Sequence, residues 1–317
     1  MQNHKFGLLL NPASGKIKKQ IDHIRNSLSA IPGLIIREPS SPSEFISALE
    51  NFSDIKITHL IIFGGDGTVQ SALSYWLNNF PKHKLPNIIL IPGGTTNMTA
   101  TDLGIRGINK SLNFLTAFIN DEISGKLINR SLIKLVTQDG HIHYGFFFGM
   151  GAIASTVNYF NQHVKKSGVT GELISAVAAA PYLLKLFFSP NDNELRQSIG
   201  GLIIDDEHRN ETNVTVLFAT TLDRLLFGLK PYWGVNLSPL HVTLIKSSAK
   251  QLWRSLYKII TNRGVHLKEK DGYISKDSKC LDLSFKGYYI IDGEIFHLQD
   301  INTIKISASP PVTFIVP

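Results

Sequence analysis

The residues best suited to chemistry form a glycine-rich stretch, Gly64-Gly65-Asp66-Gly67-Thr68, between the apolar run 57–63 and a helical pattern. Glycines let the backbone approach phosphate oxygens closely, and the N-terminus of a helix offers unpaired N–H groups to an anion. The hydroxyl of Thr68 adds a donor. The carboxylate of Asp66 does not suit an anion, so it is predicted to hold Mg²⁺ beside nucleotide phosphates, directly or through water. The alternative is a tight Gly-Asp turn without a ligand.

A second stretch of the same kind, Pro92-Gly93-Gly94-Thr95-Thr96-Asn97, follows the apolar run 87–91. Alone, it is equally typical of a simple helix cap. Beside the first loop, its glycines, hydroxyls and amide predict a second wall of a nucleotide site. Near the N-terminus, Asn11-Pro12-Ala13-Ser14-Gly15-Lys16 is not a Walker motif, because that motif needs glycine at position 10 and Ser or Thr at position 17, where the chain has leucine and isoleucine.

Two further carboxylates stand in Asp292-Gly293-Glu294, between the strand patterns 288–291 and 295–298. The spacing is typical of a type I′ hairpin turn. On spacing alone, the hairpin turn is the prediction.

The glycine loops need a scaffold that brings them together. In the first third of the chain, strand patterns at 6–10, 33–37, 57–63 and 87–91 alternate with helical patterns at 17–28, 43–52, 69–77 and 96–103. This alternation predicts a parallel sheet covered by helices, in which ligands bind at the carboxyl ends of the strands. Both glycine loops are therefore expected at the same edge of the sheet.

Beyond about residue 126 the pattern changes to strands separated by turns. The strand patterns are 131–137, 141–149, 201–205, 213–220, 240–246, 272–283 and 288–291, and helical patterns occur only at 152–188 and 249–263. Such runs predict a second, mostly antiparallel domain. We therefore expect an α/β nucleotide-binding domain at residues 1–128 and a β-rich substrate domain from residue 129 to residue 307.

Composition agrees with two folded domains, since the chain has 317 residues, of which 43% are hydrophobic and 18% charged. The formal charge of +7 favours anionic surfaces in general, but no motif points to nucleic acid, which is not expected as a partner. The single cysteine, Cys280, excludes a disulfide framework and fits a reducing cytoplasm. No signal peptide is recognisable at the N-terminus.

The apolar stretch 173–188 is short for a bilayer span and is interrupted by Pro181 and Lys185. It is predicted to be a core helix with a proline kink. The alternative is a helix that lines a lipid pocket or touches a membrane.

Taken in order, Asn11-Pro-x-Ser-Gly, Gly64-Gly-Asp-Gly-Thr, Pro92-Gly-Gly-Thr-x-Asn and Asp292-Gly-Glu resemble the motifs of the diacylglycerol kinase catalytic-domain family, which includes sphingosine kinases and bacterial soluble lipid kinases. The order and spacing of the motifs cover most of the chain. The resemblance implies an α/β nucleotide domain plus a β-sandwich domain, with the active site in the interdomain cleft. It also implies that the tail 308–317 returns to the first domain.

The resemblance implies an ATP-dependent kinase that transfers the γ-phosphate of ATP, with Mg²⁺, to a hydroxyl of a lipid or lipid-like substrate. Glu294 would be the general base, aided by Asp292, and Asp66 would lie near the metal. The nucleotide would be bound by residues of the three N-terminal motifs: Asn11, Ser14, Gly64, Gly65, Asp66, Gly67, Thr68, Gly94, Thr95 and Asn97. Transient contact with an anionic membrane surface and a homodimer are compatible with this interpretation.

The sequence departs from the family in its acidic residues. The family has an Asn-Glu pair after the first glycine loop, where this chain has Gln70 and Ser71, and an aspartate where it has Met98. The family's aspartate-bearing metal loop corresponds to 234–240 and has no acid in this chain. These losses favour, as an alternative, a non-catalytic or nucleotide-sensing member of the fold. A second alternative is an enzyme like NAD kinase, which shares the Gly-Gly-Asp-Gly-Thr loop but not the first and last motifs.

Overall fold

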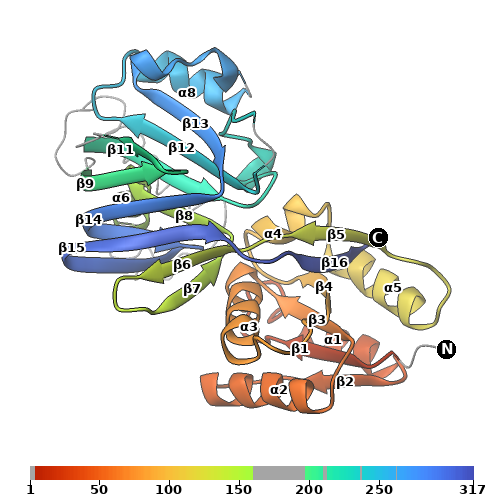
Figure 1. Cartoon of the computed structure of the whole chain (residues 1–317). Coiled ribbons are helices and arrows are strands. Elements are labelled where there is room, and N and C mark those ends of the chain that lie inside the picture. The colour runs from red at the N-terminus through yellow and green to blue at the C-terminus, as the bar shows by residue number, and fades with distance from the viewer. Residues whose placement is uncertain (1–3, 160–196, 210–212, 236–237, 262) are drawn as a thin grey trace. The chain divides into compact units, whose positions relative to one another are not determined.

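The computed structural model describes residues 4–159, 197–209, 213–235, 238–261 and 263–317. The chain forms two compact units, one made of Met1–Arg130 with Pro311–Pro317 and the other of Ser131–Pro310 (Figure 1). Most of the helical pattern predicted at 152–188, including the apolar stretch 173–188, lies outside the described residues.

The first domain is a sheet with helices packed on it, as the alternation of patterns predicted. Its elements are β1 (Phe6–Leu10), α1 (Ile21–Ser29), β2 (Leu34–Arg37), α2 (Pro42–Asp54), β3 (His59–Gly64), α3 (Asp66–Asn79), β4 (Asn87–Pro92), α4 (Met98–Asp102), α5 (Ile108–Ile119), β5 (Lys126–Arg130) and β16 (Val312–Val316). The six strands stand in the order β2-β1-β3-β4-β16-β5, and only the β16–β5 pair is antiparallel. The predicted α/β fold class is confirmed.

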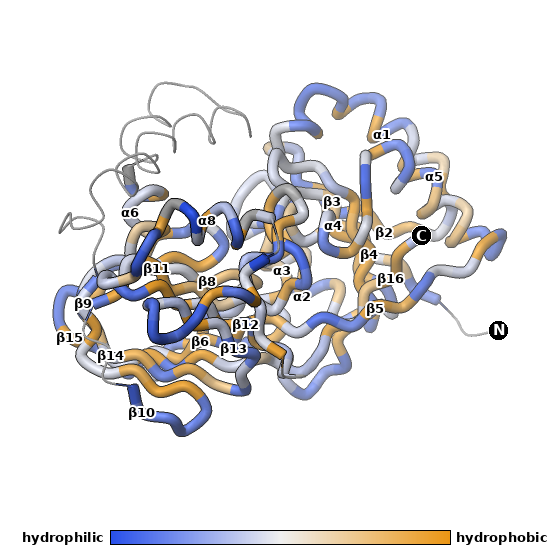
Figure 2. Tube along the Cα trace, turned by 90° about the horizontal axis from the view of Figure 1, so that it is seen from above, coloured by the Kyte–Doolittle hydropathy of each residue, from blue (hydrophilic) through white to orange (hydrophobic). Residues whose placement is uncertain are grey.

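Strands β1 and β3 are buried along their whole length, as expected where helices cover both faces of a parallel sheet. Their side chains join those of β4 in one hydrophobic core, which includes Leu8, Phe63 and Ile89. Figure 2 shows hydrophobic residues concentrated along these strands and polar residues at the loops and helix surfaces. The core therefore fixes where each strand ends, and with it the position of the glycine loops.

The start of α2 is set by local chemistry that also shapes the loop before it. Pro42 occupies the first helical turn, where its missing N–H costs nothing, and the Ser41 hydroxyl accepts the Glu44 N–H at 3.2 Å. The Glu44 carboxylate in turn accepts the backbone N–H of Ser40 at 2.8 Å, which lowers the pKa of Glu44. The β2–α2 loop is thus held by its own hydrogen bonds.

The second domain is built from antiparallel strands. Its elements are β6 (Ile133–Thr137), β7 (Ile142–Gly145), β8 (Phe147–Gly151), α6 (Ala152–Tyr159), β9 (Gln197–Ile204), β10 (Glu207–Arg209), β11 (Asn213–Thr220), η3 (Leu226–Gly228), β12 (Leu240–Lys246), α8 (Leu252–Ile260), η4 (Gly264–His266), η5 (Glu269–Asp271), β13 (Tyr273–Ser278), β14 (Cys280–Ile291) and β15 (Glu294–Ala308). Eight strands follow the order β10-β9-β11-β8-β14-β15-β6-β7, and β12 joins β11 to β13. Among the helices that the structure describes, none combines the length and apolar character needed to cross a bilayer.

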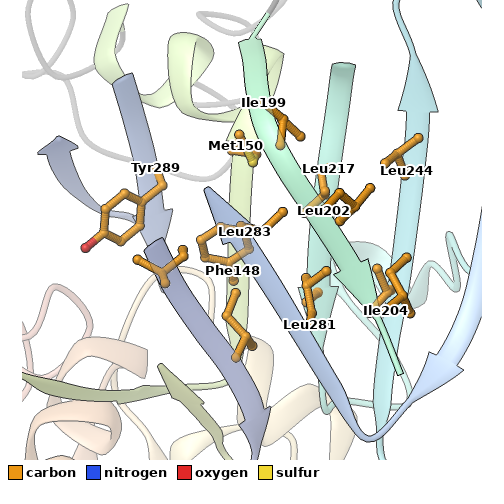
Figure 3. Packing of buried hydrophobic residues seen from close by; sticks show 14 of the residues in the cluster. Phe148, Met150, Ile199, Leu202, Ile204, Leu217, Leu244, Leu281, Leu283 and Tyr289 are labelled. Atoms are coloured by element: carbon orange, nitrogen blue, oxygen red, sulfur yellow. The ribbon is translucent and has the colours of Figure 1, made fainter. Parts of the chain in front are cut away.

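A single hydrophobic core holds these strands together. Phe148, Met150, Leu202, Leu217 and Leu283 are all at most 1% exposed and belong to one cluster. Figure 3 shows them pointing into the same interior from β8, β9, β11 and β14. The predicted mostly antiparallel domain thus has a hydrophobic core to which at least four of its strands contribute.

Two predicted strands are each divided in two by a carboxylate. The pattern 272–283 breaks at Lys279, because Asp205 accepts the backbone N–H groups of Lys279 and Cys280 at 2.7 and 3.1 Å. The pattern 141–149 breaks at Phe146, whose N–H is bound by Asp292 at 2.9 Å. The prediction of one strand in each place was wrong, because the side chain that turns the backbone is remote in sequence.

His59 provides a pH-dependent term in the stability of the first domain. It is 4% exposed and stacks on Phe6 with ring centroids 4.8 Å apart, and burial lowers its pKa from 6.5 to about 4. The unfolded chain takes up a proton below pH 6.5, but the folded chain does so only near pH 4, so stability falls as the pH falls through this window. Between pH 7 and pH 5 we expect His59 to account for about 2 kcal/mol of lost unfolding free energy.

Urea denaturation of the wild type and of His59→Phe at both pH values tests this expectation. The phenylalanine keeps a ring against Phe6 and removes the titrating group. The variant should lose less unfolding free energy than the wild type between pH 7 and pH 5. Equal losses in the two proteins would assign the acid sensitivity to other residues.

Candidate functional site

The first glycine loop joins the carboxyl end of β3 to the N-terminus of α3. Gly64 ends the strand, and a Cβ added there would lie 2.6 Å from the Thr68 side chain, so only glycine fits. Gly65 precedes the helix, and its carbonyl accepts the N–H groups of Thr68 and Val69 at 3.0 and 3.1 Å. A Cβ added to Gly67 would meet nothing within 4 Å. The loop therefore has one open side, at Gly67.

The second glycine loop lies against the first, backbone to backbone. The Gly93 N–H donates to the Gly64 carbonyl at 2.8 Å, and a Cβ added to Gly94 would lie 2.5 Å from the Cα of Gly65. Asn97 has a left-handed backbone with φ of 46°, and its amide bonds both the N–H and the carbonyl of Gly94, at 2.8 and 2.7 Å. The buried Asn97 side chain therefore fixes the backbone of the second glycine loop.

Asp66 ties the two loops together. Its Oδ2 accepts the Thr96 hydroxyl at 2.9 Å and the Met98 N–H at 2.8 Å, and its Oδ1 accepts the Thr99 N–H at 3.0 Å. The last two donors belong to the first turn of α4, whose N–H groups have no partner within the helix. The carboxylate therefore caps α4 from the neighbouring loop.

The N-terminal motif packs against both loops. The Asn11 N–H donates to the Phe63 carbonyl at 2.9 Å, and its amide nitrogen donates to the Thr68 hydroxyl at 2.9 Å. The Ser14 carbonyl accepts the Ile17 N–H at 3.0 Å, and the same turn places the Lys16 N–H 3.1 Å from the Gly93 carbonyl. This turn also brings the chain close to Thr95, whose hydroxyl would lie 3.6 Å from a Cβ at position 15.

A groove of about 820 Å³ opens beside these motifs within the first domain. Asn11, Gly67 and Thr68 form part of its wall, together with Ser71 and Tyr75 of α3. The rest of the lining comes from the first motif and the turn after it, and from the β2–α2 loop with the start of α2: Pro12, Ala13, Lys18, Pro39, Ser40, Ser41, Pro42, Phe45 and Ile46. Its size is that of a site for a nucleotide or similar ligand.

In the second domain, Asp292 and Glu294 lie on the tight turn between β14 and β15. Asp292 and Gly293 both have positive φ, 47° and 89°, as a type I′ turn requires, and Ile291 pairs with Glu294. The Asp292 carboxylate accepts the N–H groups of Phe146 and Phe147 at distances of 2.8 to 3.0 Å. It holds the β7–β8 corner.

Glu294 differs from Asp292 in being exposed at the first position of β15. Within the described part of the chain, no donor bonds its carboxylate. Of the two acids in this turn, Glu294 is therefore the one with a carboxylate available to a substrate.

The structure thus brings the predicted first-domain residues together, and it places the acidic pair in the other compact unit. Sequence reasoning missed the contribution of the β2–α2 loop to the groove. The available signal was that this loop also follows a strand of the parallel sheet, and its residues stand at the same edge as the glycine loops.

The loop 231–235 of the second domain is bonded to the neighbouring strands β12 and β13. The Trp233 N–H donates to the Ser275 hydroxyl at 2.9 Å, and His241 Nδ1 lies 2.6 Å from Asp277 Oδ1. The Tyr232 ring stacks on His241 with centroids 4.2 Å apart. Residues 234–240 contain no acid, and the neighbouring Asp277 carboxylate lies against His241. The loop therefore supplies no carboxylate of its own to the structural magnesium that the family resemblance implies, and Mg²⁺ prefers oxygen ligands of that kind.

Comparisons with known proteins agree with this geometry. The family model of the diacylglycerol kinase catalytic domain matches residues 5–125, which span the three N-terminal motifs. A comparison with curated proteins finds no match.

Three solved structures from Bacillus anthracis strain Sterne are similar in fold over the whole chain. Two are candidate diacylglycerol kinases, at 18% identity each and TM-scores of 0.70 and 0.65, and one is a diacylglycerol kinase at 14% identity and a TM-score of 0.64. Each alignment covers 100% of this chain and 98%, 99% and 98% of theirs, in that order. The first domain of this chain therefore matches the diacylglycerol kinase catalytic domain, and the whole chain shares the fold of these bacterial proteins.

Proposed function

We propose that this chain is an ATP-dependent kinase that transfers the γ-phosphate to a hydroxyl of a lipid or lipid-like acceptor. The observation that carries the proposal is the groove of about 820 Å³ whose wall includes Gly67 and Thr68 at the N-terminus of α3. Unpaired N–H groups at a helix start bind phosphate, and the open side at Gly67 leaves room for it. The family match over residues 5–125 supports a kinase.

Phosphoryl transfer needs alignment and charge neutralisation more than covalent chemistry. In this proposal the first-domain residues supply the alignment. Asn11 and Asp66 fix the glycine loops in one arrangement through the bonds to Thr68 and to the start of α4. Because these bonds are already made, the N–H groups need not reorganise when the triphosphate binds.

A magnesium ion bound with ATP would neutralise charge on the phosphates as they react. Asp66 is the residue that would hold it, directly or through water. In the described residues no cluster of three His, Cys, Asp or Glu side chains exists, but kinase sites usually hold Mg²⁺ with one or two carboxylates plus phosphate oxygens and waters. Asp66 Oδ1 accepts one hydrogen bond and keeps a free lone pair, so the residue fits this donor set.

Glu294 would accept the proton of the acceptor hydroxyl. Its exposure and its free carboxylate support this role over Asp292, which is engaged with the backbone of Phe146 and Phe147. A positioned general base typically contributes 10² to 10⁴-fold to such a step, as an order of magnitude.

Gly67→Val tests the nucleotide site without disturbing the fold. A Cβ at position 67 would meet no protein atom within 4 Å, and the residue does not have the positive φ that would strain a valine. Valine also has a helix propensity no lower than that of glycine. We expect the melting temperature to stay within a few degrees, while ATP binding by calorimetry weakens at least about tenfold, because the branched side chain fills the phosphate space. Asn109→Ala, at an exposed position of α5 outside the groove, is the control.

The reaction itself is tested by transfer of γ-³²P from ATP into a total lipid extract. Label in an organic-soluble product that is lost in Gly67→Val and in Glu294→Gln would support the proposal. ATP binding without any labelled lipid would reject the lipid acceptor and favour a nucleotide-sensing role or a soluble acceptor. Absence of ATP binding by the wild type would reject the proposal as a whole.

A further inference from the structure

The segment 246–268 in the second domain contains a concentration of positive charge. It has six Lys or Arg residues, at positions 246, 250, 254, 258, 263 and 268, and no Asp or Glu. The formal charge of the whole chain is +7. This short segment therefore carries a net charge nearly as large as that of the entire protein, and the phosphoryl-transfer proposal does not use it.

Helix α8 carries two of these charges, Arg254 and Lys258, and packs on the domain with its other side. Ser255 and Ile259 are buried, and Leu252 and Leu256 pack on a core cluster with Tyr273. The helix is thus strongly amphipathic, with its apolar side occupied by the domain itself. The side left for an outside partner is polar.

The outward side forms a cationic hollow. Arg254, Tyr257 and Lys258 of α8 line it together with Arg263 and His266, and its volume is about 680 Å³. The Tyr257 side chain is 62% exposed, so an aromatic ring stands among the cations.

Val265 adds an exposed aliphatic side chain beside these cations. It precedes His266 in η4 and is 64% exposed. The surface thus combines positive charge with exposed apolar groups. Such a combination is typical of a surface that binds a partner, and not of one that contacts only water.

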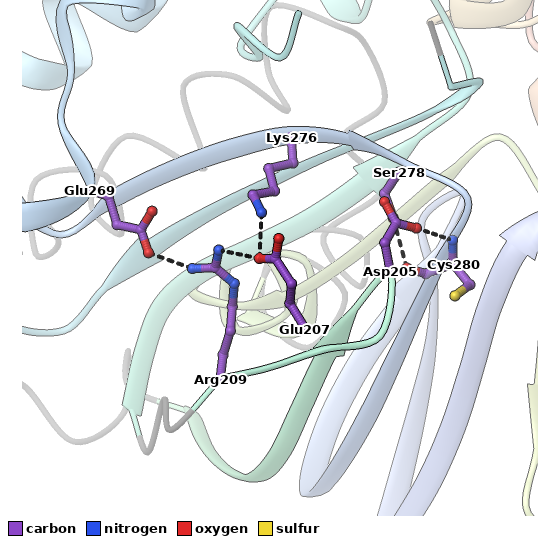
Figure 4. A network of polar contacts seen from close by, with 7 residues as sticks. All are labelled: Asp205, Glu207, Arg209, Glu269, Lys276, Ser278 and Cys280. Carbon is purple, nitrogen blue, oxygen red and sulfur yellow. Dashed lines mark hydrogen bonds and ion pairs between the residues drawn. The ribbon is translucent and has the colours of Figure 1, made fainter. Parts of the chain in front are cut away.

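Two basic side chains near this segment, Arg209 and Lys276, are paired with acids. Arg209 binds Glu207 at 3.2 Å and Glu269 at 2.6 Å, and Lys276 binds Glu207 at 2.5 Å. Figure 4 shows these ion pairs as a chain that runs from Glu269 through Arg209 and Glu207 to Lys276. Glu269, the first acid after the basic segment, is therefore already paired with Arg209.

Within the ranges that the structure describes, Arg254, Lys258 and Arg263 form no ion pair. Their charge is available to an outside anion.

We propose that the α8–η4 surface, defined by Arg254, Tyr257, Lys258, Arg263, Val265 and His266, docks on a bilayer that contains anionic phospholipids. Unpaired cations attract anionic headgroups, and the exposed aromatic and aliphatic side chains of the same surface can enter the headgroup region. A nucleic acid would use the charge but not Val265. The inference goes beyond the phosphoryl-transfer proposal, because it holds whatever hydroxyl accepts the phosphate.

Vesicle sedimentation with the purified full chain tests the docking surface independently of catalysis. The wild type should bind vesicles of phosphatidylcholine mixed with phosphatidylglycerol and should bind vesicles of phosphatidylcholine alone much less. It should lose most of its binding as NaCl screens the charges. Each cation near an anionic surface contributes about fivefold to partitioning, so the triple variant R254Q/K258Q/R263Q should bind on the order of 100-fold more weakly.

A matched variant controls for total charge. K82Q/K84Q/R106Q removes the same three charges from exposed positions of the first domain and should reduce binding much less. Y257S/V265S should bind like the wild type at low salt and lose the residual binding that persists at high salt. Circular dichroism of each variant would verify that it is folded.

Three results would overturn the proposal. The first is equal binding of the wild type to neutral and anionic vesicles, and the second is equal loss in the two charge variants. The third is displacement of the protein from anionic vesicles by free glycerol 1-phosphate at concentrations too low to change the ionic strength. That result would identify the hollow as a site for a soluble phosphate instead of a membrane surface.

Discussion

Asp66→Ala is expected to abolish phosphoryl transfer and to lower the unfolding free energy of the first domain by about 2–4 kcal/mol. The carboxylate accepts hydrogen bonds from the Thr96 hydroxyl and from the N–H groups of Met98 and Thr99. Each bond to a charged acceptor contributes about 1.5–3 kcal/mol, and the half-exposed position allows water to replace part of the loss. Thermal unfolding and the lipid-labelling assay measure the two effects.

Asp66→Asn separates the structural role from metal binding. The amide keeps one acceptor oxygen and loses the charge, so α4 should stay partly capped. If Asp66 also holds Mg²⁺, the concentration of Mg²⁺ needed for half-maximal activity should rise in this variant. If it only positions the loops, kcat should fall at every Mg²⁺ concentration. The charge-matched control is Asp22→Asn, at a side chain of α1 that is 90% exposed. If Asp66→Ala had wild-type stability and activity, both roles of Asp66 would be refuted.

Glu294→Gln should lose activity but not stability, whereas Asp292→Asn should lose stability. Glu294 is exposed and unbonded among the described residues, so its amide variant should fold normally and lose about 10² to 10⁴-fold in kcat. Asp292→Asn weakens the bonds to Phe146 and Phe147, and we expect it to lower the unfolding free energy of the second domain by about 2–4 kcal/mol. Circular dichroism melts and single-turnover labelling distinguish the two outcomes.

Asp300→Asn removes an exposed acid from the same strand, β15, and should leave both stability and kcat unchanged. A stable but inactive Asp292→Asn, together with an active Glu294→Gln, would reverse the assignment and make Asp292 the base.

Much of the first domain could be predicted because its signals are local. The strands β1, β3 and β4 consist mainly of apolar residues. A continuous apolar run is typical of a strand that is buried on both faces. The glycine loops could be placed at one edge of the sheet because parallel strands share their carboxyl ends. Helix α1 is shorter than its predicted pattern, since residues before Ile21 form turns around the first motif.

What could not be predicted depends on partners far apart in the chain. Asp66 reads as a metal ligand in sequence, and nothing in its spacing reveals that Thr96 and the start of α4 bind its oxygens. Asn97 reads as a ligand-binding amide, but its bonds go to Gly94. Polar residues near a phosphate site can serve the loop or the ligand, and only the packed structure shows which of these they bind.

The carboxylates of the hairpin show the same limit. Asp292 and Glu294 are two residues apart, and the sequence offers both as bases. The positive φ of Asp292 turns its side chain towards Phe146, and this backbone constraint is what separates the roles of the two acids.

The strand β16 has a consequence for how the protein is made. It stands between β4 and β5, with Phe314 beside Ile88 and Val312 beside Arg130. During synthesis the residues of β4 and β5 leave the ribosome long before those of β16, which follow the whole second domain. The first sheet therefore stays incomplete, with an exposed edge on β4, until Val312–Val316 have been translated. The domain that would bind the nucleotide is begun before the second domain and completed after it.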